Sequence, residues 1–125
     1  MKRIIFGIII IFFIGILISL WNIPMTKFSV VGTYANTNYN KKHCCIESPH
    51  KADNLTLMSN GTFSSEFYGK GTYEVSYGIF NTEIELHYEN VNGKSVYHSY
   101  FINKLFENPK IVLNYNTYHY YEKSK

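Results

Sequence analysis

The chain has 125 residues, of which 46% are hydrophobic and 17% are charged. This length holds one domain of ordinary size. The composition excludes a disordered, highly charged tail, and three prolines exclude a proline-rich rod. Aromatic residues reach 18%, nearly all of them Tyr and Phe. Such a mixture favours strands, because flat rings fit a pleated, half-buried surface.

The formal net charge is +3, from 12 basic and 9 acidic residues. Two of the basic residues, Lys2 and Arg3, precede an apolar segment, so the remainder of the chain is nearly balanced. A nucleic-acid-binding surface needs a basic stripe that neutralises phosphates. The short basic groups at residues 41–42 and at residues 123 and 125 do not form one. We therefore expect no nucleic-acid partner.

Residues 4–21 form an uncharged, apolar run. In a helix, about 18 to 20 apolar residues span roughly the 30 Å of a bilayer's hydrocarbon core. Lys2 and Arg3 give a positive flank that stays in the cytoplasm, and Trp21 stands where interfacial aromatic residues are found. Pro24 ends the helix. The run therefore predicts an N-terminal transmembrane helix.

Three interpretations of this run compete: an uncleaved signal anchor, a cleaved secretory signal and a buried core helix. A cleavable signal has a shorter apolar core, about 7 to 15 residues, followed by a pair of small residues. The sequence Ser19-Leu20-Trp21-Asn22 offers no such pair. We expect residues 1–24 to form a signal anchor with a cytoplasmic N-terminus. Residues 25–125 then form an exported domain in the periplasm or outside the cell.

After Pro24 the sequence alternates between apolar and polar residues, as strands do. The predicted strands cover residues 28–34, 53–58, 62–68, 72–77, 82–88, 95–103, 110–115 and 118–122. Asn60-Gly61 and Asn90-Val-Asn-Gly93 are hairpin signals, and Gly69-Lys-Gly71 reads as a turn or bend. Residues 35–52 are expected to be a long polar loop. The side chains expected to point inward are Phe28, Val30, Tyr34, Leu55, Leu57, Phe63, Phe67, Tyr73, Val75, Tyr77, Ile84, Leu86 and Tyr88.

No segment after Pro24 has helical periodicity over three turns. Parallel strands need crossover connections, so the sheet is expected to be antiparallel. Sequential antiparallel strands leave open edges unless they close on themselves. The sequence therefore predicts an all-β domain, an antiparallel up-and-down barrel of about eight strands. A sandwich of two sheets is the alternative.

Several short patterns resemble one family. They are Val31-Gly-Thr-Tyr34, Asp53-x-Leu-x-Leu57 with Asn60-Gly-Thr-Phe63, and Gly71-x-Tyr73 before Ile84-x-Leu86. Their order is similar to that of short bacterial lipocalin-like domains, with Tyr34 at the position where those domains often carry Trp. The resemblance covers roughly residues 28–88. It implies a lipocalin-like barrel and an envelope or secreted protein, and it implies no particular ligand.

Cys44 and Cys45 are adjacent in the predicted loop and are the only two cysteines of the sequence. Neighbouring cysteines cannot join distant segments, and a bond between them strains the peptide. Four states stay open: a vicinal disulfide, free or buried thiols, intermolecular disulfides, and a metal site. For the last, His43, Cys44, Cys45 and His50 supply soft donors that suit Zn(II) or Cu(I). The states in which the two cysteines have no redox or metal function remain the preferred interpretation.

Tyrosines gather near the C-terminal end of the sequence. In a strand, Tyr118 and Tyr120 would share one face, and His119 and Tyr121 the other. Together with Tyr115, Tyr118 and Tyr120 are candidate ligand-binding residues, since tyrosines at a barrel mouth stack on flat ligands and donate hydrogen bonds. The alternative is that these tyrosines only close the barrel.

Catalytic motifs are lacking in the sequence: it has no phosphate loop, no His-Glu-x-x-His and no nucleophile elbow. His87 and His98 fall on strand positions expected to face solvent, and Glu83, Glu85 and Glu89 share an outer face. We expect a non-catalytic binding or interaction module with no cofactor. We expect its helix to hold it in the membrane, and its partner to be an envelope protein or a small apolar ligand. The alternatives are a carrier of a small apolar molecule inside the barrel, and a redox or metal-handling protein acting through Cys44 and Cys45.

Overall fold

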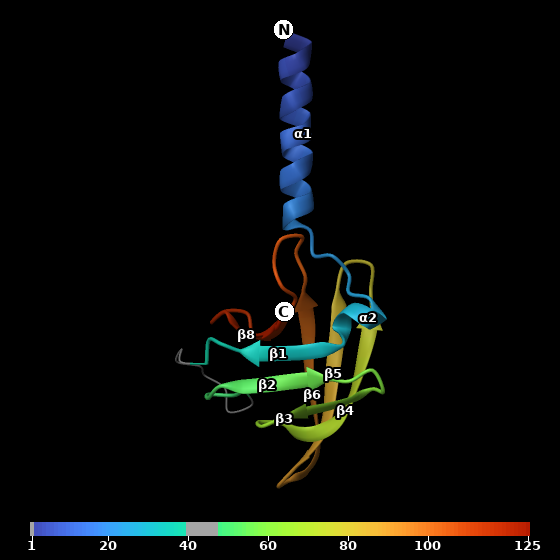
Figure 1. Ribbon diagram of the computed structural model, residues 1–125, viewed down its shortest axis with the longest axis vertical. Helices are drawn as coiled ribbons and strands as arrows, with labels where there is room; N and C mark the ends of the chain where they lie inside the picture. Colours follow the sequence, from blue (N-terminus) through green and yellow to red (C-terminus); the bar gives the residue numbers. More distant parts are fainter. Residues whose placement is uncertain (1, 40–47) are drawn as a thin grey trace.

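The computed structural model describes residues 2–39 and 48–125. Within these ranges one long apolar helix precedes eight antiparallel strands that close into a barrel (Figure 1), as predicted. The elements are α1 (Lys2–Leu20), α2 (Lys27–Val30), β1 (Gly32–Asn36), β2 (Asp53–Leu57), β3 (Thr62–Ser65), β4 (Gly69–Tyr77), β5 (Thr82–Asn90), β6 (Gly93–Ile102), β7 (Lys110–Asn114) and β8 (His119–Lys123).

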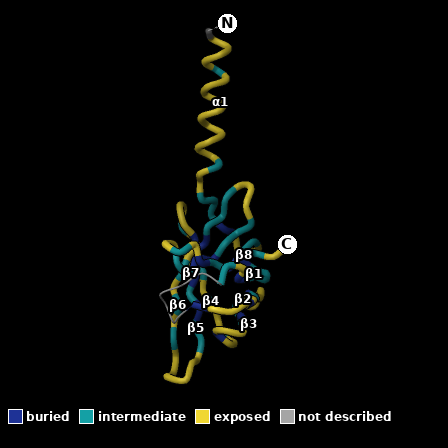
Figure 2. The backbone as a smooth tube through the Cα atoms, turned by 90° about the vertical axis from the view of Figure 1, so that its left-hand side faces the viewer, coloured by how far each residue is buried: buried dark blue, intermediate teal, exposed yellow. Residues whose placement is uncertain are grey.

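Helix α1 extends away from the barrel and packs against none of it over its apolar length. None of the window Arg3–Leu20 is buried, and Figure 2 shows the helix exposed along most of its course. The interpretation of this segment as a buried core helix is therefore wrong. Its length and composition suit a membrane-spanning helix or a signal sequence.

The short helix α2 was not predicted. Thr26 caps it: Thr26 Oγ1 accepts from the Ser29 N–H at 3.2 Å, and Ser29 Oγ accepts from the Thr26 N–H at 2.7 Å. This reciprocal capping box is worth about 1 kcal/mol. The first strand consequently begins at Gly32 rather than Phe28, and Phe28 is 91% exposed instead of facing the core.

The strands follow one another around the barrel in chain order, and β1 pairs with β8 through Tyr34–Lys123 and Ala35–Glu122. In such an up-and-down order, successive turns alternate between the two ends of the barrel. The chain enters β1 at the same end as the β2–β3, β4–β5 and β6–β7 connections. Helix α1 therefore joins the barrel at that end, which we call the proximal end (Figure 1).

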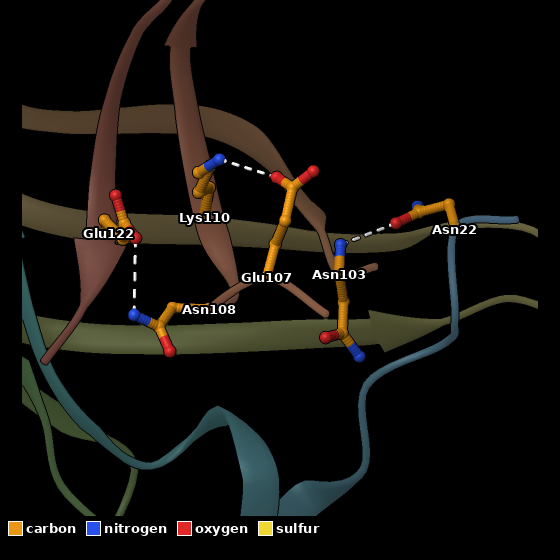
Figure 3. A network of polar contacts seen from close by, with 6 residues as sticks. All are labelled: Asn22, Asn103, Glu107, Asn108, Lys110 and Glu122. Carbon is orange, nitrogen blue, oxygen red and sulfur yellow. Dashed lines mark hydrogen bonds and ion pairs between the residues drawn. The ribbon is translucent and has the colours of Figure 1, made fainter. Parts of the chain in front are cut away.

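A linker of residues 21–26 joins α1 to the barrel and is itself part of the fold. Asn103 N donates to Asn22 Oδ1 at 2.7 Å (Figure 3). Asn22 Nδ2 donates to the Phe101 carbonyl at 3.1 Å. The Ile23 N–H donates to the Asn103 carbonyl at 2.7 Å, and Asn103 Nδ2 donates back to the Ile23 carbonyl at 3.1 Å. Further along, Met25 is buried and its N–H donates to Thr82 Oγ1. The end of α1 is thus fixed to β6 and to the start of β5.

The barrel interior is filled by its own side chains. The largest are aromatic, and aliphatic residues fill the space between them. This core consists of Met25, Val30, Tyr34, Leu55, Leu57, Phe63, Tyr68, Ile84, Leu86, Phe101, Ile111 and Tyr121. Short strands that carry bulky inward residues make a packed core, as small barrels do.

Asp53 is a buried carboxylate within this core. Asp53, 5% exposed, accepts hydrogen bonds from Tyr121 Oη, from Ser65 Oγ at 2.7 Å and from the Glu66 N–H at 2.8 Å. A buried carboxylate is tolerated because three donors replace its water. Burial, together with the hydrogen bond to Asp53, raises the pKa of Tyr121. The network joins β2, β3 and β8.

The structure corrects several strand details. Strand β3 ends at Ser65 and a turn follows, so Tyr68 is buried and Phe67 points outward, the reverse of the prediction. Gly69-Lys-Gly71 forms the first part of β4 rather than a turn. Tyr77, expected inward, is half exposed at the end of β4. The turn after Ser65 shifts the alternation by one residue, which reverses Phe67 and Tyr68, whereas Tyr77 is exposed because it is the last residue of its strand.

Candidate functional site

The three tyrosines predicted to bind a ligand line one groove. Tyr115 and Tyr118 stand on the turn between β7 and β8, and Tyr120 lies on β8. The groove has a volume of about 370 Å³ and also takes residues from the β6–β7 loop and from β7. Tyr115 and Tyr118 are both well exposed, with ring centroids 6.4 Å apart and planes tilted by 34°. Two exposed rings beside a hollow form a surface on which a flat or apolar group can pack.

Tyr118 adopts an unusual backbone conformation, with a φ of 52°. A side chain of this size is rarely found in the left-handed region, which costs about 1–2 kcal/mol outside glycine and asparagine. Asn38 supports it: its Nδ2 donates to the Tyr118 carbonyl, and its Oδ1 accepts from the Tyr120 N–H at 3.3 Å. The amide thereby fixes the turn that presents the Tyr118 ring. Strain of this kind concentrates at functional sites, so it supports the groove as a site.

Charged groups line the other side of the groove. Lys110 Nζ donates to Glu107 Oε2 at 2.7 Å, and this hydrogen bond raises the pKa of Lys110 and lowers that of Glu107 (Figure 3). Lys110 Nζ also lies 5.1 Å from the centroid of the Tyr120 ring. Lys104 lines the same groove. A ligand here meets aromatic faces on one side and ammonium donors on the other.

The predicted pairing of faces on the last strand is partly wrong. Tyr118 belongs to the turn, so it does not share a strand face with Tyr120. His119 and Tyr121 are both fully buried and point into the barrel, where they close it. Asn36 Nδ2 lies 3.0 Å from His119 Nε2, and because an amide nitrogen only donates, the imidazole nitrogen accepts. Tyr121 therefore closes the barrel without lining the groove, whereas the buried His119 also contributes to the groove's lining.

The predicted metal or redox set is only partly within the structure. His43, Cys44 and Cys45 lie outside the described residues. His50 is described and exposed, and it lines a surface hollow with Asp53 and Phe67. The thiol and metal hypotheses for this set stay predictions.

A second cluster, on the outer face of β4–β6, could not be assembled before the register was known. Glu74 stands opposite Glu85, and Glu85 stands opposite His98. Ligand atoms of Glu74, Glu85 and His87 lie within 4.8 Å of one another. Glu85 also lies 3.3 Å from His98 Nδ1 and 3.5 Å from His87 Nε2. Imidazole and carboxylate groups are suitable Zn²⁺ ligands, but this cluster lies on the open outer face of the sheet, where acidic groups are common without a metal. We therefore assign the cluster no ligand.

Comparison of the chain with protein-family models, with curated proteins and with solved structures gave no match. The similarity to lipocalin-like domains therefore remains a prediction, while the closed antiparallel barrel is observed directly. The function has to be argued from the helix, the filled interior and the groove.

Proposed function

We propose that the chain is a membrane-anchored, non-catalytic binding module. Helix α1 spans the bilayer, and the barrel on its far side presents the tyrosine groove. The observation that carries the proposal is the junction: an unburied apolar helix ends at Leu20, and hydrogen bonds to the barrel begin at Asn22. A cleaved signal sequence is removed from the domain that follows it, whereas α1 is separated by a single residue from Asn22, which is hydrogen-bonded to the barrel.

The orientation follows from the flanking charges. Lys2 and Arg3 precede the helix, and basic flanks stay in the cytoplasm. The barrel then lies outside the cytoplasm, in the periplasm or beyond the cell. Its interior supports a surface-binding role over the carrier alternative, because bulky side chains such as Tyr34, Phe63 and Phe101 occupy the space that a carried molecule would need.

The groove indicates the chemistry of the partner. Tyr115 and Tyr118 offer ring faces, and Lys104 and Lys110 offer donors. The partner is an envelope component that packs a flat or apolar group between the rings and presents hydrogen-bond acceptors to the lysines.

Anchoring is tested on the full chain by intact mass and by extraction of membranes at alkaline pH. We expect the unprocessed mass, and retention in the membrane. The double variant Ile9→Lys/Phe13→Lys should release the protein, because each lysine at a helix centre costs about 2.5–3.5 kcal/mol for insertion. The matched control Val91→Lys/Asn92→Lys adds the same charge on an exposed hairpin and should stay in the membrane. A mature mass that lacks residues 1–24 would contradict the anchor.

Binding by the groove is tested with a photo-reactive residue at position 118, compared with one at position 91, which is also exposed but lies outside the groove. We expect a cross-linked product from position 118 that disappears in the Tyr115→Ala variant. Identical products from both positions would count against the groove.

A further inference from the structure

Four large apolar residues are exposed on two connections at the proximal end of the barrel. Ile79 and Phe80, at the tip of the β4–β5 turn, are 78% and 71% exposed. Leu105 and Phe106, in the β6–β7 loop, are 50% and 87% exposed. We call these four residues and Trp21 the apolar rim. The β6–β7 loop lies directly beneath the end of α1, and the β4–β5 turn lies to one side of it at the same end of the barrel (Figure 1). Bulky apolar side chains held in water on adjacent loops mark a contact surface.

The apolar rim is continuous with the helix. The Trp21 ring, at the end of α1, lies 6.3 Å from the ring of Phe80, measured between centroids. Trp21 is itself exposed. The apolar surface of α1 therefore extends onto the β4–β5 turn without a polar gap between these two rings.

The linker gives the barrel no room to move away from the helix. Four hydrogen bonds join Asn22 and Ile23 to Phe101 and Asn103, and Asn103 begins the β6–β7 loop. Leu105 and Phe106 follow two and three positions later in the same loop. The depth of α1 in a bilayer therefore sets the height of the apolar rim.

The length of α1 sets that depth. Its apolar window has 18 residues. At 1.5 Å a residue this is about 27 Å, slightly less than the roughly 30 Å of hydrocarbon that it has to cross. A helix that is short for its bilayer draws its flanking residues toward the lipid. Trp21 and the loops fixed beside it then lie at the level of the headgroups, where aromatic residues are favoured.

We propose that the apolar rim is a second membrane-binding site, which inserts into the interfacial region of the same leaflet in which α1 ends. Ile79, Phe80, Leu105 and Phe106 contact acyl chains and glycerol groups, so the barrel rests end-on against the bilayer rather than swinging on a tether. This inference rests on the proposed anchoring by α1. We assign lipid rather than a protein partner to this surface, because the apolar rim lies beside the end of the membrane-spanning helix, on the side of the barrel that faces the bilayer.

The test uses the full chain in vesicles of phosphatidylcholine and phosphatidylglycerol. In a Cys44→Ser/Cys45→Ser background, single cysteines at Ile79, Leu105 or Val91 carry a fluorescent label, so that Phe80 and Phe106 stay native. We expect labels at positions 79 and 105 to be quenched by spin-labelled lipid and protected from iodide in the water. The label at position 91, on the β5–β6 hairpin at the opposite end, should show the reverse. Iodide quenching at 79 and 105 equal to that at 91 overturns the proposal.

A label at Leu17 separates the failure of the second membrane-binding site from the failure of the anchor. Quenching of this label by lipid shows that α1 is inserted, whatever the apolar rim does. If position 17 is inserted while 79 and 105 stand in water, the second site is wrong and the anchor stands. If position 17 is also in water, the anchor itself is wrong.

Two further measurements keep the outcome specific. The variant Phe80→Asp/Phe106→Asp should expose the labels at 79 and 105 to iodide without changing the label at 17. Val91→Asp, the matched control, should change none of them. Protection at 105 that vanishes when the protein is diluted into excess lipid would show that a second copy covers the rim, and would overturn the assignment to lipid.

Discussion

Strand β5 ends in two turns of opposite character, one at each end of the barrel. At the proximal end the turn is Gly-Ile-Phe-Asn, closed by the Gly78 N–H donating to the Asn81 carbonyl at 2.8 Å. At the other end Asn90 pairs with Gly93, whose φ is 111°, and the Asn90 side chain accepts from the Asn92 N–H at 2.9 Å. Both turns reverse the same strand with good hydrogen bonds.

The difference between the two turns is therefore not required by the fold. The β5–β6 hairpin is polar apart from Val91 and carries the local hydrogen bonds typical of a turn in water. The β4–β5 turn holds Ile79 and Phe80 in the same environment unless a membrane covers them. Substitutions at the proximal end should therefore change the contact with lipid, whereas the same substitutions on the β5–β6 hairpin should not. Substitutions in the barrel walls should instead change the free energy of unfolding.

The largest expected effect on stability is at Gly71. A Cβ atom at this position would lie 2.0 Å from the His87 carbonyl oxygen and 2.8 Å from a ring carbon of Phe63. Because the carbonyl is backbone, β4 and β5 would have to separate. We expect Gly71→Ala to lower the free energy of unfolding by about 3 kcal/mol, measured by urea titration in micelles. Thr72→Ala is the control and should cost less than about 1 kcal/mol. Retention in the membrane should be unchanged, and release would contradict independent anchoring.

The next effect is expected at the junction. Asn22→Ala removes an acceptor for the Asn103 N–H and a donor to the Phe101 carbonyl, which are partly buried. We expect a loss of about 1–2 kcal/mol in the free energy of unfolding. A label at position 105 should also become more accessible to iodide, because the barrel is no longer fixed to the helix. Asn92→Ala, on the opposite hairpin, should change neither quantity.

A smaller effect concerns the interior that both ends share. Burial raises the pKa of Tyr34, whose hydroxyl donates to the Val30 carbonyl at 2.7 Å. The folded state therefore keeps the phenol neutral where the unfolded state ionises it. Stability should be constant below about pH 10 and fall by up to about 1.4 kcal/mol per pH unit above it from this group. Tyr34→Phe should cost about 1 kcal/mol at neutral pH and show a shallower alkaline decline. Equal slopes in urea titrations from pH 8 to 11 would contradict the assignment.

The smallest effect is a gain. Asparagine tolerates the left-handed conformation that Tyr118 adopts, so Tyr118→Asn should raise the free energy of unfolding by up to about 1 kcal/mol. Tyr115→Asn is the control, and no such gain is expected for it. If Tyr118→Asn also weakens cross-linking from a photo-reactive residue at position 115, then this strain is retained for binding. A loss of stability in Tyr118→Asn would show that the conformation is not strained.

Much of this architecture follows from the sequence. The uncharged run after Arg3 predicts α1, and alternating segments bounded by Asn-Gly turns predict the barrel. Three features were not predicted from the sequence, and each has a physical reason. Helix α2 is a single turn, too short for a periodic pattern, although Thr26 and Ser29 carry the capping signal. The Phe67–Tyr68 reversal depends on where a turn begins. The φ of Tyr118 depends on Asn38, which is distant in sequence.

The candidate surfaces were harder to predict because each combines separate segments. The groove was found in part, since Tyr115, Tyr118 and Tyr120 are close in sequence. The apolar rim was missed, although the parity of turns in an up-and-down barrel already places the β4–β5 and β6–β7 connections beside the entering chain. The Glu74–Glu85–His98 row needed the strand register, which alternation alone does not fix across two hairpins.

The seam between β1 and β8 has a consequence for how the chain acquires its structure. Strand β1 cannot pair with β8 until β8 has been made, so during synthesis the incomplete sheet has two open edges that can pair with strands of other chains. Closure depends on contacts between the extremes of the domain, which makes folding slow. A nascent chain that is already held at the bilayer by α1 would be separated from other copies of the chain until its barrel closes, so early insertion would protect it from aggregation.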